Sequence, residues 1–160
     1  MRIVVLSDTH VPTRASGIPG RVYEECAKSD LVIHAGDFVE SFVLEDLERL
    51  APVRGVLGNM DGFDLSRLLG QKLEFELEGS RIGLIHGWGP PWDLEARVRK
   101  SFDVEPDIII HGHSHEWQEK WTGEKLLLNP GSASGGSGSS FAILTLSRGS
   151  RPLVEKISLA

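Results

Sequence analysis

The chain has only one cysteine, Cys26, among its 160 residues, so it cannot form an intrachain disulfide. It also has no apolar run near the length of about 20 residues that a membrane-spanning helix requires. A short strand-like run follows Arg2 directly, and we therefore expect no signal peptide and no membrane association. Since disulfides are rare in reducing compartments, their absence favours a cytoplasmic protein.

Positive charge is scarce as well. Lysine and arginine number 17 against 23 aspartates and glutamates, which gives a formal net charge of −6. General affinity for a nucleic-acid backbone needs a basic patch, and the chain contains no run of basic residues. We therefore expect a small phosphorylated ligand to be accepted more easily than long DNA or RNA.

Length and composition fit one globular domain over residues 1–160, with 40% hydrophobic and 25% charged residues. Short, β-branched, nearly uncharged runs predict strands that are buried on both faces. These runs are Ile3 to Leu6, Leu31 to Ile33, Val53 to Leu57, Ile82 to Ile85 and Ile108 to Ile110.

Helical patterns separate the first three of these runs, at Ile18 to Lys28 and at Glu40 to Leu50. Such a β-α-β-α-β half implies a parallel sheet with right-handed crossovers. A third helix is expected from about Trp92 to Phe102. The remaining expected strands are Leu73 to Leu77, Glu116 to Trp121, Lys125 to Leu128, Phe141 to Leu146 and Leu153 to Ile157. Together these elements predict an α/β fold, a four-layer α-β-β-α sandwich of two mixed sheets flanked by helices.

Seven potential metal ligands stand in five short clusters, nearly all directly after an apolar run. They are Asp8, His10, Asp37, Asn59, His86, His113 and His115. The exit ends of parallel strands meet at one edge of a sheet, where open α/β folds place their sites. The spacing therefore predicts a metal site, and a two-metal site is favoured.

Each cluster alone has an ordinary explanation. D-x-H is common by chance, and G-D or G-N often marks a turn at the end of a strand. The pair His113 and His115 is a stronger signal, because two histidines flank one serine directly after three isoleucines. His34 and His111 lie within strand runs, so we expect them to pack or to support ligands.

The ordered set of motifs D-x-H, G-D, G-N-x-D, H-G and G-H-x-H resembles the calcineurin-like metallophosphoesterase superfamily. The closer resemblance is to its small single-domain branch of phosphodiesterases, to which the eukaryotic retromer scaffold subunit is related. Stretches that carry the resemblance include Ile82 to Gly87, Phe102 to His115 and Asn129 to Ser132.

The resemblance implies two divalent transition-metal ions, with manganese preferred and nickel, iron or zinc as alternatives. Asp8, His10 and His115 would hold one ion, and Asn59, His86 and His113 the other. Asp37 would bridge the two ions. The implied activity is hydrolysis of a small phosphodiester by attack of a metal-bridging hydroxide, with Asp37, Asn59 and His86 at the reacting centre.

Met60 departs from the pattern of many phosphomonoesterases in the superfamily, which carry a histidine at this position. Methionine cannot protonate a leaving oxygen, so Met60 favours a phosphodiesterase. Asp61 follows it, and is expected either to assist catalysis by orienting neighbouring groups or a water, or simply to form a turn.

Two alternative functions remain open: a protein-binding scaffold on the same fold, and a small-molecule phosphomonoesterase. Trp88 and Trp92 could form a wall of the active-site cleft. Trp117 and Trp121 could belong to the core or to a homodimer contact, with core packing as the default for all four. The Gly/Ser-rich segment 131–140 is interpreted as a mobile loop.

Overall fold

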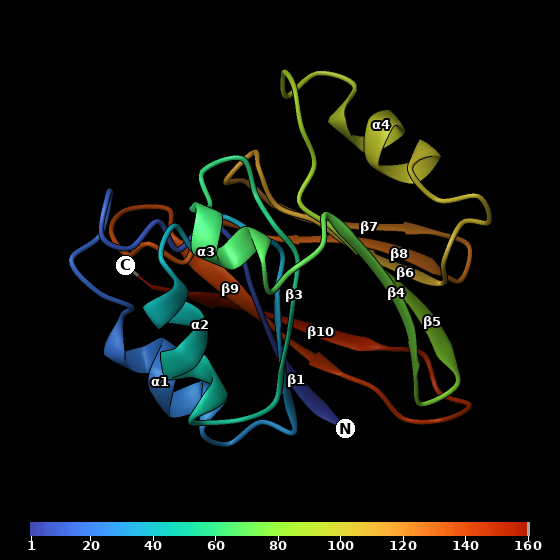
Figure 1. The fold of residues 1–160 in the computed structure, drawn as a ribbon. Coiled ribbons are helices and arrows are strands. Elements are labelled where there is room, and N and C mark those ends of the chain that lie inside the picture. The colour runs from blue at the N-terminus through green and yellow to red at the C-terminus, as the bar shows by residue number, and fades with distance from the viewer. Residues whose placement is uncertain (160) are drawn as a thin grey trace.

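The chain folds into two five-stranded sheets packed face to face (Figure 1). The computed structural model describes residues 1–159; the domain expected over 1–160 includes Ala160, which lies outside the described residues. The first sheet has the order β10-β9-β1-β2-β3. Its strands are β1 (Arg2–Leu6), β2 (Leu31–His34), β3 (Val53–Gly55), β9 (Ser140–Thr145) and β10 (Leu153–Ser158).

The second sheet has the order β4-β5-β6-β8-β7. Its strands are β4 (Lys72–Leu77), β5 (Ser80–Ile85), β6 (Ile108–Ile110), β7 (Trp117–Thr122) and β8 (Lys125–Pro130). Both sheets are mixed: β1, β2 and β3 run parallel, as do β5, β6 and β8, while antiparallel strands flank them.

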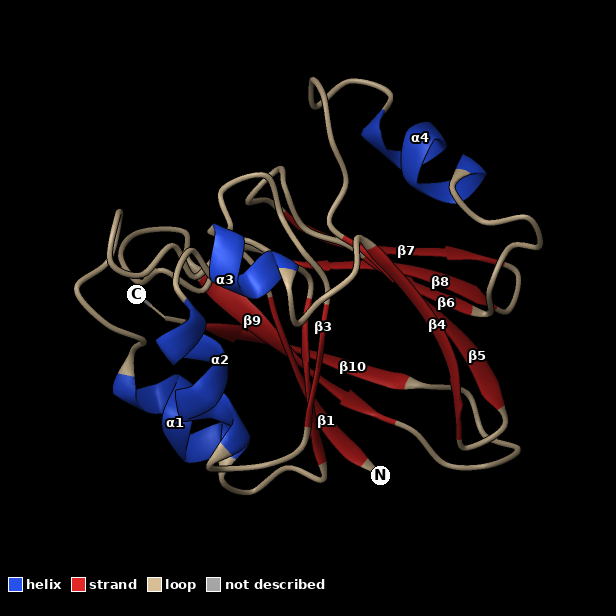
Figure 2. Ribbon diagram, viewed as in Figure 1, coloured by secondary structure: helices blue, strands red, loops and turns tan. Residues whose placement is uncertain are grey.

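Helices α1 (Gly20–Cys26) and α2 (Ser41–Glu48) cover the outer face of the first sheet, and α4 (Leu94–Lys100) covers the second (Figure 2). Alternation along the strands explains these layers. In β1, Ile3 and Val5 face the other sheet, whereas Val4 and Leu6 pack with Val22 beneath the helices. A smaller cluster around Val98 seals α4 onto the second sheet. The predicted four-layer α-β-β-α sandwich is confirmed.

The ends of several elements differ from expectation. The third strand ends at Gly55 rather than Leu57, and each predicted helix is shorter by one or two residues at each end. A one-turn helix, α3 (Phe63–Ser66), was not predicted, because four residues are too few to show helical periodicity. None of the described helices is long and apolar enough to cross a membrane.

The segment 131–140 departs from the prediction of a mobile loop. Ser132 and Ala133 are buried, and residues 136–138 alone are exposed. The Ser132 hydroxyl donates to the Asp8 carbonyl at 2.7 Å, and the Ala133 amide donates to the Ser7 carbonyl at 2.9 Å. The first half of the segment is therefore buried and hydrogen-bonded beneath the loop after β1, and mobility stays a prediction for the exposed residues 136–138.

Candidate metal centre

Five loops bring the seven predicted donors to one edge of the sandwich. They follow β1, β2 and β3 in one sheet and β5 and β6 in the other. Because each set of strands is parallel, all of these exits lie at the same edge. Donors far apart in the sequence, such as His10 and His115, which are separated by 105 residues, thereby come into contact.

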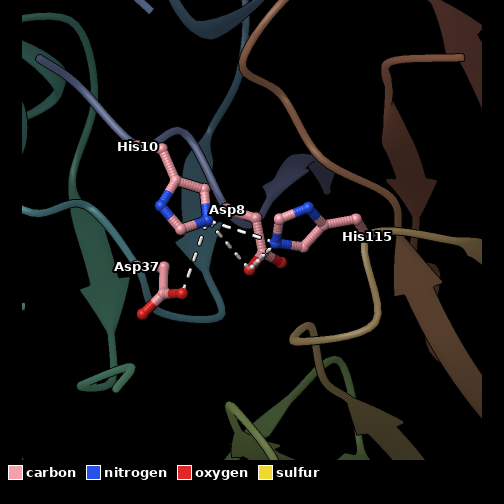
Figure 3. Close-up of side chains that lie close together, drawn as sticks. All are labelled: Asp8, His10, Asp37 and His115. Atoms are coloured by element: carbon pink, nitrogen blue, oxygen red, sulfur yellow. Dashed lines mark hydrogen bonds and ion pairs between the residues drawn. The ribbon is translucent and has the colours of Figure 1, made fainter. Parts of the chain in front are cut away.

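One group of donors consists of Asp8, His10, Asp37 and His115, whose ligand atoms converge on one point (Figure 3). His10 Nε2 lies 3.2 Å from His115 Nε2, 3.4 Å from Asp37 Oδ2 and 3.6 Å from Asp8 Oδ1. His115 Nε2 lies 3.2 Å from the same Asp8 oxygen. All four ligand atoms lie within 4.8 Å of one another.

A second group lies beside the first and shares Asp37 with it. His86 Nε2 is 3.4 Å from Asp37 Oδ2 and 3.1 Å from Asn59 Oδ1. His113 Nδ1 is 3.2 Å from the same Asn59 oxygen. Asp37 Oδ2 is therefore equally close to a histidine of each group.

The other oxygen of each carboxylate is occupied by protein donors. Asp37 Oδ1 accepts the Met60 amide at 2.8 Å, which turns Oδ2 toward both groups. Asp8 Oδ2 accepts the Ser7 hydroxyl at 2.5 Å and the His113 amide at 3.1 Å. Asp8 Oδ1 is buried and has no hydrogen-bond partner. A buried carboxylate oxygen without a partner is costly, and a cation at this point would satisfy it.

Hydrogen bonds at the far side of two histidines set which nitrogen can bind a metal. His86 Nδ1 donates to the Ala35 carbonyl at 2.6 Å, which leaves Nε2 directed at Asp37. His113 Nε2 donates to the Gly89 carbonyl at 2.8 Å, which leaves Nδ1 directed at Asn59. Ligating histidines commonly use such carbonyl partners to fix the ring and the tautomer.

The donor spacing fits divalent metal ions. Two ligands about 2.1 Å from one ion lie roughly 3.0–3.4 Å apart in octahedral or tetrahedral geometry, and most of the separations above fall in this range. Mixed imidazole and oxygen donors suit manganese, iron, nickel or zinc. The donor types and their spacing therefore suit the cluster of aspartates and histidines to binding a divalent metal ion.

The two aspartates are held ionised. Burial opposes ionisation of Asp8, but the nearby imidazoles of His10 and His115 outweigh it and place its pKa far below the usual range. Burial likewise raises the pKa of Asp37, but the contact with His86 lowers it by more, so the net pKa lies below its ordinary value. The pKa of His86 responds in the opposite sense: burial lowers it, and Asp37 raises it above its ordinary value. Metal ligands must be unprotonated, so a metal ion would displace any proton that His86 carries.

The backbone around the donors adopts unusual conformations. Asp8, His10, Asp37, His113 and His115 all have positive φ, between 49° and 73°. This left-handed region is uncommon for residues other than glycine, and such strain concentrates at functional sites. Five of the seven predicted donors share it, which indicates that the fold holds these side chains in place at some cost.

Three other residues singled out in the sequence, Asp61, His34 and His111, lie around the donors without joining either group. Asp61 accepts three backbone amides, those of Asp37 and Gly58 on Oδ2 and that of Val39 on Oδ1. Its carboxylate thus ties the loop after β2 to the loop after β3, and burial raises its pKa although these amides oppose the rise.

His34 and His111 take the supporting positions expected of them. His34 stacks on Phe38 and contacts the Thr9 hydroxyl at 3.1 Å. Burial lowers the pKa of His34 to about 3, so the ring is neutral near pH 7. His111 is buried, with Nε2 3.1 Å from Gln118 Oε1.

The tryptophans divide into two pairs. Trp117 and Trp121 pack against the core between the sheets, so the default expectation of core packing is confirmed for this pair. Trp88 and Trp92 are 50% and 71% exposed, so core packing is wrong for both. Trp88 lines a pocket beside Asn59 and His86, whereas Trp92 does not.

Sequence reasoning missed the residues that position the donors. Ser7 and Ser132 bind the Asp8 carboxylate and carbonyl, and Gly112 lets the two loops approach closely. A Cβ atom on Gly112 would collide with the Ser7 hydroxyl and lie 2.7 Å from Asp8 Oδ2. No local pattern signals these contacts, although Gly112 does precede the histidine pair.

Comparison with known proteins agrees with the geometry. Residues 1–149 match the model of the calcineurin-like phosphoesterase superfamily domain. A probable metallophosphoesterase of Methanothermobacter thermautotrophicus is 41% identical over 136 residues, which cover 82% of this chain and 77% of that protein.

Two solved structures show the same fold. Wild-type Vps29 of Entamoeba histolytica complexed with zinc has a TM-score of 0.76 and 27% identity, covering 100% of both chains. An archaeal phosphodiesterase has a TM-score of 0.74 and 25% identity, covering 98% of this chain and 99% of that one. On its sequence, its fold and its cluster of donors, the chain belongs to the calcineurin-like phosphoesterase superfamily.

Proposed function

We propose that this protein is a phosphodiesterase that holds two divalent ions and hydrolyses small phosphodiesters. The observation that carries the proposal is the position of Asp37 Oδ2, 3.4 Å from both His10 Nε2 and His86 Nε2. One carboxylate oxygen between two groups of donors is the arrangement that a bridging ligand requires. Two metals about 3.5–4 Å apart, when bound, lower the pKa of a water and stabilise both oxygens of an in-line displacement.

The charge of the site suits a phosphoester. Of the seven donors only Asp8 and Asp37 are anionic, and both are held ionised. Two divalent ions bring four positive charges, so the loaded site keeps a net positive charge. Phosphate oxygens are attracted there even though the whole chain carries −6.

Within this proposal the residues have distinct roles. Asn59 and His86 lie at the edge of the centre that opens into a pocket, where they would contact the substrate as well as an ion. Asp37 joins the two halves, and Asp61 acts through the backbone by holding the loop of Asp37 in place. Asp61 is thus a positioning residue.

A diester is preferred because the site offers no proton donor at Met60. The Met60 amide binds Asp37, and its side chain is 45% exposed. The similarity to a phosphodiesterase supports the same preference. The scaffold alternative is not favoured, because every predicted ligand position holds a competent donor directed at the others.

Metal content tests the bridging role. Elemental analysis of the wild type should find two ions per chain, while Asp37→Ala should lose both and His115→Ala mainly one. The reason is that Asp37 serves both groups and His115 only one. Full occupancy and activity in Asp37→Ala would show that the two groups do not share this ligand.

Substrate preference is tested separately. The metal-loaded protein, supplied with manganese or nickel, should hydrolyse bis(p-nitrophenyl) phosphate faster than p-nitrophenyl phosphate, and EDTA should abolish both activities. A faster rate with the monoester would overturn the preference for diesters. A fully loaded protein that is inert toward both esters would instead point to the scaffold function.

A further inference from the structure

A pocket of about 300 Å³ opens directly beside the second group of donors. Asn59 and His86 form one side of it, and Leu57, Ile85 and Trp88 contribute apolar surface. The volume is at the lower end of the range of about 300–1,000 Å³ for small-ligand pockets. It therefore suits one ring-sized group attached to whatever binds at the centre.

The backbone that carries Trp88 is fixed although its ring is half exposed. Arg97 of α4 donates to the carbonyls of Trp88 at 2.9 Å and Trp92 at 3.0 Å, and also to that of Pro90. The Gly89 carbonyl accepts from His113. The segment from β5 to α4, which extends beyond the sheets in Figure 1, is thus tied to both a helix and a candidate ligand.

A rigid backbone that presents an exposed indole is an economical way to bind a flat group, since little conformational entropy is lost when the partner arrives. Trp88 is half exposed and lines this pocket, so part of its surface is open to a ligand. Gln71 and Ser66 add polar groups to the same pocket, where they can bind the edge of a ring.

The opposite side of the centre has a different character. The pocket beside His115 is lined mainly by serines and glycines of the segment 131–140, together with Lys156. The tryptophan that lines this second pocket, Trp117, packs against the core, and Lys156 Nζ lies 5.4 Å from the centre of its ring. A flat apolar group is therefore better accommodated beside His86 than beside His115.

We propose that Trp88 determines substrate specificity by stacking on a planar aromatic substituent of the phosphoester, either a simple aryl ring or a nucleobase. This inference rests on the proposed function, since the phosphoryl group is what places the substituent next to Asn59 and His86. Arg97 is the positioning residue that holds the Trp88 segment.

Binding of product-like anions to the metal-loaded protein tests the inference without turnover. Two matched pairs are titrated by calorimetry: phenylphosphonate against methylphosphonate, and adenosine 5′-monophosphate against ribose 5-phosphate. Stacking on one aromatic side chain should make the aromatic member of a pair bind roughly tenfold more tightly. Whichever pair shows the larger ratio identifies the aryl or the nucleobase source.

Variants assign the preference to Trp88. Trp88→Ala should bring the affinity ratio close to one, and Trp88→Phe should restore part of it. Trp92→Ala is the matched control, since Trp92 lies on the same segment but outside the pocket, and it should keep the wild-type ratio. Arg97→Ala should lower the ratio, because the backbone of Trp88 loses its attachment to α4.

The outcomes separate this inference from the proposed function. If methylphosphonate binds but neither aromatic partner binds more tightly, or if Trp88→Ala keeps the ratio, the role of Trp88 is wrong and the metal centre stands. If no phosphonate or phosphate binds to the loaded protein, the proposed function fails and the role of Trp88 fails with it.

Discussion

At the scale of single residues, the candidate centre depends on the hydrogen bonds made by the polar side-chain atoms that point away from it. Met60 and Ser7 take one oxygen of Asp37 and of Asp8, and carbonyls take one nitrogen of His86 and of His113. In each of these four donors the remaining atom faces the centre. The four side chains are therefore oriented before any metal arrives, which reduces the cost of binding.

Met60 should control the balance between diester and monoester hydrolysis. Met60→His introduces a group that can protonate a leaving oxygen, and general acid catalysis is worth about 10²–10⁴-fold where the geometry is suitable. We expect the ratio of monoesterase to diesterase rates to rise in this variant, measured with the p-nitrophenyl esters. Met60→Gln is the control, because glutamine is polar but cannot supply the proton. An equal rise in both variants would show that polarity rather than proton transfer is responsible.

Asp61 should affect metal affinity although it is no ligand. In Asp61→Asn one oxygen becomes an NH₂ group that faces a backbone amide, and an unsatisfied buried donor costs about 1–3 kcal/mol. We expect a lower unfolding midpoint and weaker metal binding by calorimetry, since the loop of Asp37 loses its attachment. Asp103→Asn, at an exposed position, should change neither quantity. Unaltered metal affinity in Asp61→Asn would show that Asp61 only stabilises the turn and does not position Asp37.

At the scale of elements, short buried strands deliver the donors and tight loops hold them. Strands of three to six residues leave little freedom at their ends, and the donors occupy the first few positions beyond β1, β2, β3, β5 and β6. The loops after β1 and β6 approach so closely that Gly112 has no room for a side chain. Positive φ at five donors shows the same constraint on the backbone.

Gly112→Ala should test this approach of two loops. The added methyl group would displace Ser7 or Asp8, and overpacking of this kind typically costs about 1–3 kcal/mol. We expect reduced metal occupancy in elemental analysis and a lower free energy of unfolding in denaturant titration. Gly17→Ala is the control, because a Cβ there meets no atom within 4 Å. If Gly112→Ala bound metal as the wild type does, the loops would be more adaptable than the structure indicates.

At the scale of the whole molecule, the sandwich is held by three apolar layers, and charged groups gather at the edge between its sheets. The layer between the sheets includes Ile3, Ile33, Leu84 and Ile110. Burial continues to this edge, where Asp8, His10, His34 and His86 are almost fully covered. Burial shifts the pKa values of such groups away from those in the unfolded chain, and the free energy of unfolding therefore depends on pH.

His34 should make the metal-free protein less stable in acid. Its pKa is about 3 in the folded state and near 6.5 when unfolded, so the unfolded chain binds more protons. The stability that the neutral ring provides is complete above about pH 6.5 and is lost as the pH falls from there toward 3. Between pH 7.5 and 5 the loss is about 2 kcal/mol.

The measurement compares wild type with His34→Gln by denaturant unfolding in EDTA at both pH values. The variant should lose about 2 kcal/mol less stability than the wild type over this interval. The comparison removes the contribution of His86, whose raised pKa acts in the opposite direction. Equal losses in the two proteins would mean that His34 is not responsible.

The sequence alone determined the layers and the set of candidate donors that meet at one edge. Short β-branched apolar runs such as Ile108–Ile110 favour buried strands, and a polar residue directly after such a strand lies at the sheet edge. That reasoning needs only local pattern and chain order. It therefore succeeded for the four-layer fold and for the meeting of seven donors, although the resemblance to a family was needed to divide them into two groups.

Tertiary structure decided everything that depends on contacts between distant segments. The anchoring of Ser132 to Asp8, the three carbonyl contacts of Arg97 and the amides held by Asp61 join residues from different loops, and no periodicity encodes them. The one-turn helix α3 escaped prediction for a related reason, since it owes its position to packing of Leu65 in the core rather than to an amphipathic repeat. Local pattern specifies which residues reach the edge, whereas packing between the two sheets fixes how their atoms are aimed.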